Sequence, residues 1–125
     1  MRSVTEVDEI IAIMSRYCHS IDDRRFDDLA ALMTDDVRFE MGEDVTDTRD
    51  SFIKYVLANI WPAGRHVCYN PEIEIAGDRA TSVSDWLFLD GQLNIVSAGR
   101  YTDDFARVND RWRLAVRRIT TFGSA

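Results

Sequence analysis

The second half of the sequence alternates apolar and polar residues over long stretches, which is the pattern of β-strands. We expect strands over residues 65–69, continuing after Asn70-Pro71 into 72–76, and then over 79–89, 92–105 and 111–121. Residue pairs typical of turns separate them, namely Gly77-Asp78, Asp90-Gly91 and Asn109-Asp110, of which Asp90-Gly91 favours a type I′ turn. A meander of long antiparallel strands is therefore the main constraint on the fold.

The first half has the spacing of helices. Apolar residues between Val7 and Ile21 form one stripe about 120° wide on a helix, and Ser3 and Glu6 have the spacing of a capping box. A shorter helical pattern covers residues 26–33, and a third covers 49–60, with Asp47 or Thr48 as its cap and Pro62 as its stop. Between these two helices, alternation over 37–41 predicts a strand that Gly42-Glu43-Asp44 ends.

This order of elements predicts an α+β fold, in which three helices from the first half pack on one face of a curved antiparallel sheet. A curved sheet of this kind encloses a pocket against its helices. Large apolar residues on several strands exceed what one pocket and one helix layer can cover: Trp86, Phe88, Ile95 and Tyr101. We therefore expect a homodimer or homotrimer.

Length and charge narrow the class of protein. A length of 125 residues fits a single domain over residues 1–125, and a net charge of −7 repels a phosphate backbone, so we expect no nucleic-acid partner. No apolar stretch approaches the roughly 20 residues of a membrane helix, and the start lacks a signal-peptide pattern. We expect a cytoplasmic protein without a membrane partner. Cys18 and Cys68 are expected to be free and inert.

Two motifs carry a family resemblance. The spacing Tyr17-x-x-x-x-Asp22 at a helix end, followed by Phe26-x-x-Leu29 and the run LMTDDV, resembles the SnoaL-like branch of the nuclear transport factor 2-like, or cystatin-like, superfamily. The resemblance covers nearly the whole chain. It implies a cone-shaped sheet with the helices on its concave face, and it is strongest toward the dehydratases and dehydrochlorinases of that superfamily.

His66 and Asp22 are the leading candidates for catalysis. The segment WPAGRHVCYN resembles the strand in which the dehydrochlorinase branch carries a histidine, and the resemblance pairs that histidine with an aspartate at the position of Asp22. A carboxylate that accepts a hydrogen bond from one imidazole nitrogen leaves the other nitrogen as a general base. The alternatives are a packed histidine in a strand and a solvated aspartate at a helix end.

Tyr17 and Arg117 are further catalytic candidates that the resemblance implies. Tyr17 matches the position of a tyrosine in bile-acid dehydratases, where a phenol can donate a hydrogen bond to a developing oxyanion, but it lies about 140° from Asp22 on a regular helix. Arg117 matches an arginine five residues after a tryptophan, here Trp112, and a buried guanidinium could hold a leaving anion. Core packing for Tyr17 and a solvated basic edge for Arg117 are the alternatives.

Four residues are candidates for substrate binding: Phe39, Met41, Asp85 and Trp86. Asp85 shares an apolar strand face with Val83 and Leu87, where burial raises the pKa of a carboxyl group, and Trp86 lies on the other face of the strand. The sequence does not tell which of these faces looks into the pocket. Met41 stands where ketosteroid isomerases carry an aspartate, which argues against a steroid-isomerase mechanism.

The sequence has no dinucleotide, P-loop or nucleophile-elbow motif, and its two histidines lack the spacing of a metal site, so we expect neither a cofactor nor a metal. The leading interpretation is a cofactor-independent lyase that removes water or a hydrogen halide from a small hydrophobic molecule. An isomerase or cyclase on the same residues is the nearest alternative. A non-catalytic domain for ligand binding or assembly is the alternative of another class.

Overall fold

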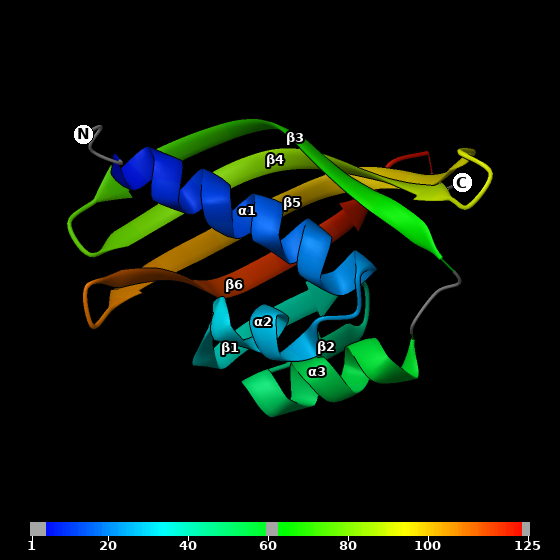
Figure 1. Ribbon diagram of the computed structural model, residues 1–125. Helices are drawn as coiled ribbons and strands as arrows, with labels where there is room; N and C mark the ends of the chain where they lie inside the picture. The colour runs from blue at the N-terminus through cyan, green and yellow to red at the C-terminus, as the bar shows by residue number, and fades with distance from the viewer. Residues whose placement is uncertain (1–4, 60–62, 124–125) are drawn as a thin grey trace.

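A computed structural model describes residues 5–59 and 63–123 (Figure 1). Three helices belong to the first half of the chain: α1 (Glu6–Asp22), α2 (Phe26–Ala31) and α3 (Arg49–Ala58). The strands are β1 (Met33–Met41), β2 (Asp44–Thr46), β3 (Gly64–Ala76), β4 (Arg79–Asp90), β5 (Ile95–Val108) and β6 (Arg111–Thr121). The expected α+β class is confirmed.

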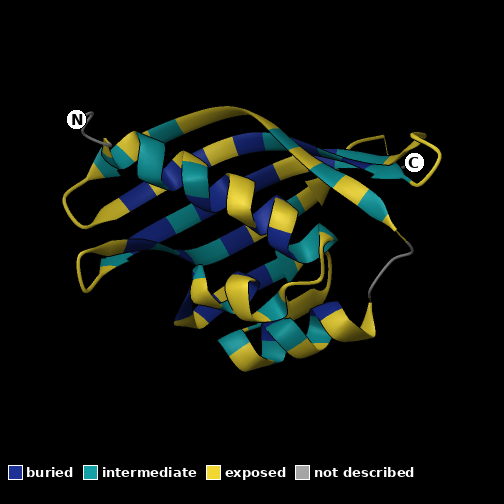
Figure 2. Cartoon of the chain, viewed as in Figure 1, coloured by how far each residue is buried: buried dark blue, intermediate teal, exposed yellow. Residues whose placement is uncertain are grey.

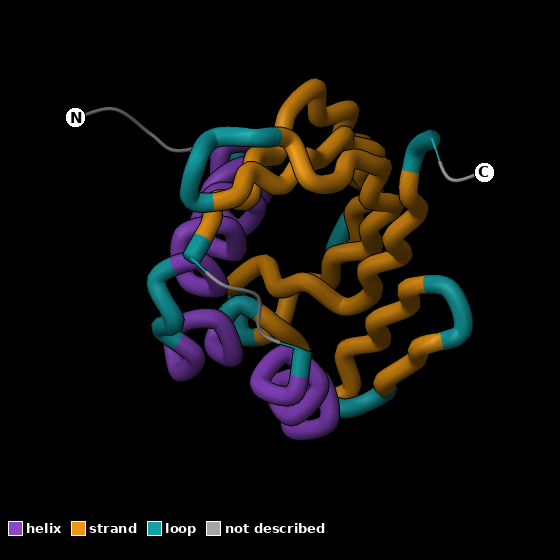
Figure 3. The backbone as a smooth tube through the Cα atoms, turned by 90° about the vertical axis from the view of Figure 1, so that its right-hand side faces the viewer, coloured by secondary structure: helices purple, strands orange, loops and turns teal. Residues whose placement is uncertain are grey.

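The strands form one curved sheet in the order β2-β1-β6-β5-β4-β3. Strands β3 to β6 are the expected antiparallel meander, but β1 runs parallel to β6, with Phe39 beside Arg117. This pair departs from the fully antiparallel expectation because β1 docks beside the last strand instead of joining it through a turn. Figure 3 shows the sheet curling around and the helices lying along its open side.

Helix α1 is capped two residues later than expected. The Thr5 hydroxyl accepts a hydrogen bond from the Asp8 backbone, and the Asp8 carboxylate accepts one from the Thr5 backbone, which is a complete capping box. Ser3 lies outside the described residues. The middle and end of the apolar stripe are buried as expected, against β3 and β6, but Val7 and Ile11 near its start are exposed. Asp22 is the last residue of the helix.

Other boundaries differ from the expectation around β1 and α3. The second helix ends at Ala31, and Met33 already belongs to β1, where the Leu114 N–H donates to the Leu32 carbonyl beside it. Strand β2 was not expected, because a three-residue strand carries no readable alternation. Helix α3 ends at Ala58; Ile60 and Pro62, which were assigned to its end and its stop, lie outside the described residues.

The turns of the meander agree with the sequence at two of three places. Asn109 and Asp110 both have positive φ, and Gly77 has a φ of +61°. At the third, a longer loop replaces the expected two-residue turn, because the Asp90 carboxylate accepts hydrogen bonds from the Gln92 and Asn94 backbones. Asn70 and Pro71 do not end a strand but form a bulge within β3.

Buried and exposed residues alternate along β4 (Figure 2). The face of the sheet that looks toward the helices is therefore buried, and the opposite, convex face is largely exposed. Trp86, Phe88 and Tyr101 form a buried cluster on the concave face, which corrects the expectation that they need a partner chain to cover them. Ile95 alone of that group is exposed. Within the described residues, no helix has the length and hydropathy needed to cross a membrane.

Candidate active site

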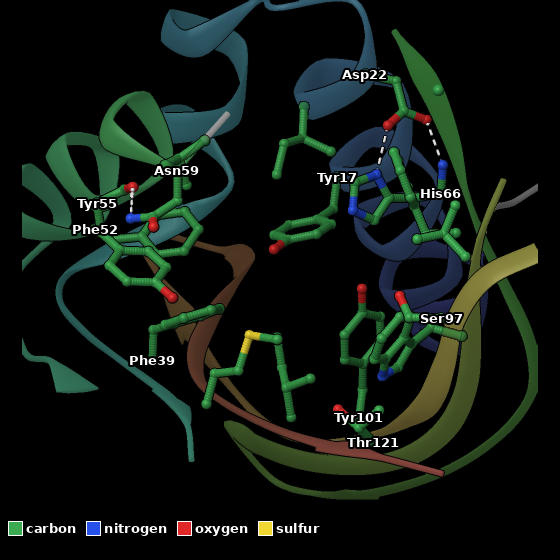
Figure 4. Close-up of a pocket in the computed structure, with 18 of the residues that line it drawn as sticks. Tyr17, Asp22, Phe39, Phe52, Tyr55, Asn59, His66, Ser97, Tyr101 and Thr121 are labelled. Carbon is green, nitrogen blue, oxygen red and sulfur yellow. Dashed lines mark hydrogen bonds and ion pairs between the residues drawn. The ribbon is translucent and has the colours of Figure 1, made fainter. Parts of the chain in front are cut away.

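A cavity of about 430 Å³ lies between the concave face of the sheet and the helices (Figure 4). The end of α1, the side of α3 and strands β1, β3, β4, β5 and β6 all contribute to its wall. Most of that wall is apolar, and its main apolar residues are Phe39, Phe52, Val56, Trp86, Phe88 and Ile119. The cavity therefore suits a ligand with a hydrophobic body.

His66 and Asp22 meet at one side of this cavity. His66 Nδ1 lies 2.5 Å from Asp22 Oδ1, and the His66 backbone N–H donates to Asp22 Oδ2 over 2.7 Å. The Asp22 side chain is 5% exposed and that of His66 is 20% exposed. Because a carboxylate only accepts hydrogen bonds, Nδ1 is the donor of this contact, and in the neutral imidazole the Nε2 nitrogen then has the lone pair. The pair thus has the form of a histidine base oriented by a carboxylate.

Local structure places these two residues. Alternation in β3 turns Arg65 and Val67 outward and His66 inward, where its ring packs 4.8 Å from the ring of Phe88. Asp22 reaches the cavity although it lies far around the helix from Tyr17, because α1 ends there and its last turn stands over the cavity. Trp61 and Pro62, which carried part of the sequence resemblance, lie outside the described residues.

Tyr17 lines the same cavity from α1, one and a half turns before Asp22. Its side chain is almost fully buried, and its hydroxyl is turned toward the open space (Figure 4). Burial raises the pKa of Tyr17, which the nearby Arg117 guanidinium opposes in part. The phenol therefore stays protonated near neutral pH and is a hydrogen-bond donor.

Arg117 is buried behind two tyrosines and does not line the cavity. It is 2% exposed and forms two hydrogen bonds of 2.9 Å with Asp103, which is fully buried on the neighbouring strand. Its Cζ lies 4.2 Å from the ring centre of Tyr17 and 3.7 Å from that of Tyr101. The alternative that Arg117 belongs to a solvated basic edge of the sheet is thus wrong. Because the two tyrosines separate Arg117 from the cavity, its buried position also does not fit direct contact with a ligand.

The ion pair with Asp103 keeps the Arg117 side chain positively charged. Burial alone would lower the pKa of Arg117, but the Asp103 carboxylate outweighs it and holds that pKa well above its ordinary value. The two charges neutralise each other beneath the cavity floor. The guanidinium is therefore a permanent part of the structure under the tyrosines.

The four candidates for substrate binding divide into two groups. Phe39, Met41 and Trp86 line the cavity. Asp85 does not, because alternation along β4 turns it to the convex face, where it accepts a hydrogen bond of 3.0 Å from Arg100. The apolar strand face around Asp85 is thus the outer one, which corrects its assignment to the pocket.

Several lining residues were not expected from the sequence. Tyr101 on β5, Tyr55 and Asn59 at α3, Ser97 and Thr121 bring polar groups to the cavity (Figure 4). Alternation along β5 could have placed Tyr101 and Asp103 on one face, but nothing in the sequence marks that face as the concave one.

A second, smaller cavity of about 240 Å³ lies on the other side of the pair, between α1 and β3. Asp22 and His66 line both cavities, and Cys18 and Cys68 line the smaller one. Burial raises the pKa of Cys68 and raises that of Cys18 to about 12, so both thiols stay protonated near neutral pH. Both cysteines are free, as expected.

Across residues 5–59 and 63–123, no three histidine, cysteine, aspartate or glutamate side chains gather as a metal site would require. The comparison with known families identifies the chain instead. A family model of the SnoaL-like domain matches residues 2–118. The chain belongs to the SnoaL-like family.

One protein of similar sequence and one of similar structure are both of unknown function. An uncharacterised protein of Mycobacterium tuberculosis is 32% identical over 97% of this chain and 90% of its own length. A Nostoc punctiforme protein of unknown function with a cystatin-like fold superposes with a TM-score of 0.88 at 22% identity, covering 98% of this chain and 97% of its own. The SnoaL-like chain therefore has the cystatin-like fold.

Two similar solved structures bear the names of lyases. A Novosphingobium aromaticivorans protein provisionally assigned as a scytalone dehydratase has a TM-score of 0.82 at 22% identity, over 93% of this chain and 83% of its own. A hexachlorocyclohexane dehydrochlorinase, LinA type 2, has a TM-score of 0.81 at 20% identity, over 91% of this chain and 83% of its own. At this identity the likeness shows the shared fold alone.

Proposed function

We propose that this SnoaL-like protein is a cofactor-independent lyase that eliminates water or a hydrogen halide from a small hydrophobic molecule. The contact between Asp22 and His66 at the wall of a mainly apolar cavity is the observation that supports this most. The names of two structurally similar proteins, a dehydratase and a dehydrochlorinase, point to the same class of reaction.

The proposed reaction begins at His66 Nε2. This nitrogen takes a proton from a substrate carbon, the electrons of that C–H bond form a double bond to the neighbouring carbon, and the bond to the leaving group breaks with its electrons. A halide leaves as the anion, and the His66 imidazolium then gives its proton to solvent. A hydroxyl leaves as water, because it takes that proton back from His66 Nε2. Asp22 stabilises the imidazolium that results and keeps the ring in place. The Tyr17 hydroxyl is the proposed donor to negative charge that develops on the substrate.

An isomerase or cyclase would use the same first step, since proton abstraction by His66 also starts those reactions. The paired contact and the cavity support this whole group of reactions over a non-catalytic domain. In a binding or assembly domain we would expect the histidine to be packed shut. His66 instead lines an open cavity, and no hydrogen bond to its Nε2 nitrogen is found within residues 5–59 and 63–123.

The test starts from the molecules that bind. A thermal-stabilisation screen with cyclic alcohols, alkyl halides and ketones identifies ligands, because any compound that binds the folded protein raises its melting temperature by mass action. Ligands with a leaving group are then assayed for alkene formation and halide release. We expect turnover that His66→Gln lowers by about 10²- to 10⁴-fold. Binding without any product, for every ligand found and at every pH tested, would exclude the lyase.

A further inference from the structure

A third cavity, which we call the outer cleft, lies between α1, α2 and the start of β6 (Figure 1). It has a volume of about 600 Å³, and the residues that define it are Arg16, Arg25, Arg111, Trp112 and Arg113. Among the described residues, none lines both the outer cleft and either of the two cavities beside the candidate catalytic pair. The outer cleft is therefore a separate feature of the molecule.

Positive charge gathers in the outer cleft. Four arginines line it, and the acidic residues in its wall are Glu9 and Asp28, which leaves an excess of two positive charges. The whole chain has a net charge of −7, so this excess is local and does not follow from the composition. The arginines come from α1, from the start of α2 and from β6, which only the fold brings together. A cluster assembled in this way attracts an anion.

Two of the four arginines are used by the fold. Arg25 forms an ion pair of 3.0 Å with Asp28, and Arg113 donates to a backbone carbonyl at the end of α2. Arg16 and Arg111 are both exposed, and neither has an ion pair or a side-chain hydrogen bond within residues 5–59 and 63–123. Their guanidinium groups can therefore bind an anion without breaking an internal contact.

Apolar side chains in the same wall suit a ligand with a hydrophobic body. Ile13, Leu32 and Trp112 line the outer cleft. Trp112 is 5% exposed, and its indole N–H has no hydrogen-bond partner in the parts of the chain that the structure describes. The outer cleft thus combines apolar surface with more hydrogen-bond donors than acceptors, which matches an apolar molecule that carries an oxyanion.

The excess of two positive charges selects the kind of anion. A phosphate monoester carries a charge of about −1.5 to −2 near pH 7, which matches this excess. Its oxygens pair with the planar fork of an arginine, a side chain that is favoured for phosphate recognition. A carboxylate with a single charge would compensate only about half of the excess. The acidic residues elsewhere in the chain repel a long polyanion, so the matching ligand is a small molecule.

We propose that the outer cleft binds a small phosphate monoester with an apolar body, and that Arg16 and Arg111 hold its phosphate group. The apolar body lies against Trp112. This site is additional to the cavity of His66 and Asp22, and it does not depend on the proposed lyase.

The experiment is an NMR titration of the full chain with 1-naphthyl phosphate, in which the indole N–H signal of Trp112 reports on the outer cleft. We expect that signal to move and saturate, and 1-naphthol, the same rings without the phosphate, to bind there about 10-fold more weakly. Arg16→Gln/Arg111→Gln should weaken binding of the phosphate by about 10-fold, the loss of two exposed charge pairs. The control Lys54→Gln/Arg79→Gln removes two exposed charges outside the cleft and should keep the affinity.

The pH gives a second measurement that needs no variant. At pH 5 a phosphate monoester keeps little more than one negative charge while the arginines keep theirs, so wild-type protein should bind 1-naphthyl phosphate about 3- to 5-fold more weakly than at pH 7.5. If Arg16→Gln/Arg111→Gln does not fold, this pH dependence decides.

Three outcomes would overturn the proposal: a Trp112 signal that does not move with 1-naphthyl phosphate at up to about 10 mM, equal binding of 1-naphthol in the outer cleft, or full affinity in Arg16→Gln/Arg111→Gln. His66→Gln should bind 1-naphthyl phosphate as wild-type protein does. Failure of the lyase and failure of this site therefore give different results.

Discussion

Asp22 holds His66 with both of its oxygens, one on the imidazole Nδ1 at 2.5 Å and one on the backbone N–H of the same residue at 2.7 Å. The two contacts tie the end of α1 to β3 and orient the ring at the same time. A carboxylate at a helix end that served only as a solvated charge would make neither contact. The geometry therefore makes sharp predictions for a single-atom change in Asp22.

Asp22→Asn should reverse the tautomer of His66. The backbone N–H of His66 requires the amide oxygen, which turns the amide NH₂ toward Nδ1, and Nδ1 must then accept a hydrogen bond while Nε2 carries the proton. Long-range ¹H–¹⁵N NMR of the imidazole reads this directly. Activity should fall by orders of magnitude because the base is lost. The control Asp23→Asn, at the next and more exposed position, should change neither the tautomer of His66 nor the activity. If the nitrogen signals of His66 stay unchanged in Asp22→Asn, the pair has no part in the mechanism.

His66→Gln should lower turnover of any substrate found by about 10²- to 10⁴-fold, the usual contribution of a general base. The fold should persist, because the lost ring is partly exposed and only modestly apolar. Rates and melting temperatures of the two proteins check this. His19→Gln alters the exposed histidine of α1 and is the matched control, with activity expected to stay within about twofold of wild type.

Arg117→Met should destabilise the protein by about 3–5 kcal/mol, because it leaves the Asp103 carboxylate buried without its partner. Urea unfolding measures the change. Arg118→Met removes a half-exposed arginine from the adjacent position and should cost less than about 1 kcal/mol. The double variant Arg117→Met/Asp103→Leu should recover part of the loss, and a single variant as stable as wild type would contradict the buried ion pair.

Alkaline pH should weaken the fold through Cys18. Its pKa is raised from 9.0 to about 12 by burial, so above pH 9 the unfolded chain loses this proton while the folded protein keeps it. Unfolding is then favoured as pH rises, by up to about 1.4 kcal/mol per pH unit from this one group. Urea midpoints between pH 8 and pH 10 should fall less steeply in Cys18→Ala than in wild type. Equal slopes would contradict the buried, protonated thiol.

The expected homo-oligomer remains a prediction that now depends on the convex face. Val67, Tyr69 and Val83 expose apolar surface there, on the neighbouring strands β3 and β4. We expect this face to be covered by another copy of the chain, so light scattering at micromolar concentration should give a dimer or trimer. Val83→Asp should shift it toward the monomer. A monomeric wild-type protein would end this prediction.

Much of the fold could be predicted because it depends on local spacing. Seven apolar residues on one stripe were enough for α1, and alternation was enough for β3, β4, β5 and β6. What spacing cannot tell is which side of a strand faces the helices, since both faces of β4 carry large apolar residues. Alternation alone therefore leaves open whether Asp85 or Trp86 faces the pocket, and it does not mark Tyr101 on β5 as a lining residue.

In the candidate site, too, local spacing predicts some features and leaves others open. The link between His66 and Asp22 came from a resemblance at matching positions, because 44 residues of sequence separate the two and no local rule connects them. The helical angle between Tyr17 and Asp22 counted against a shared site, yet both line the cavity because the helix ends there. The partner of Arg117, Asp103, depends on the register between β5 and β6, which the sequence does not encode locally.

The parallel contact between β1 and β6 has a consequence for how the chain folds. Hairpins from β3 to β6 close over short turns, but within the sheet β1 and β2 reach the other strands only through β6. Met33 must therefore find Leu114, a contact between distant parts of the chain, and such contacts slow folding. Phe39 joins the wall that holds His66 only at this step, so a kinetic intermediate made of the meander alone would lack one side of the cavity and could not bind a ligand there.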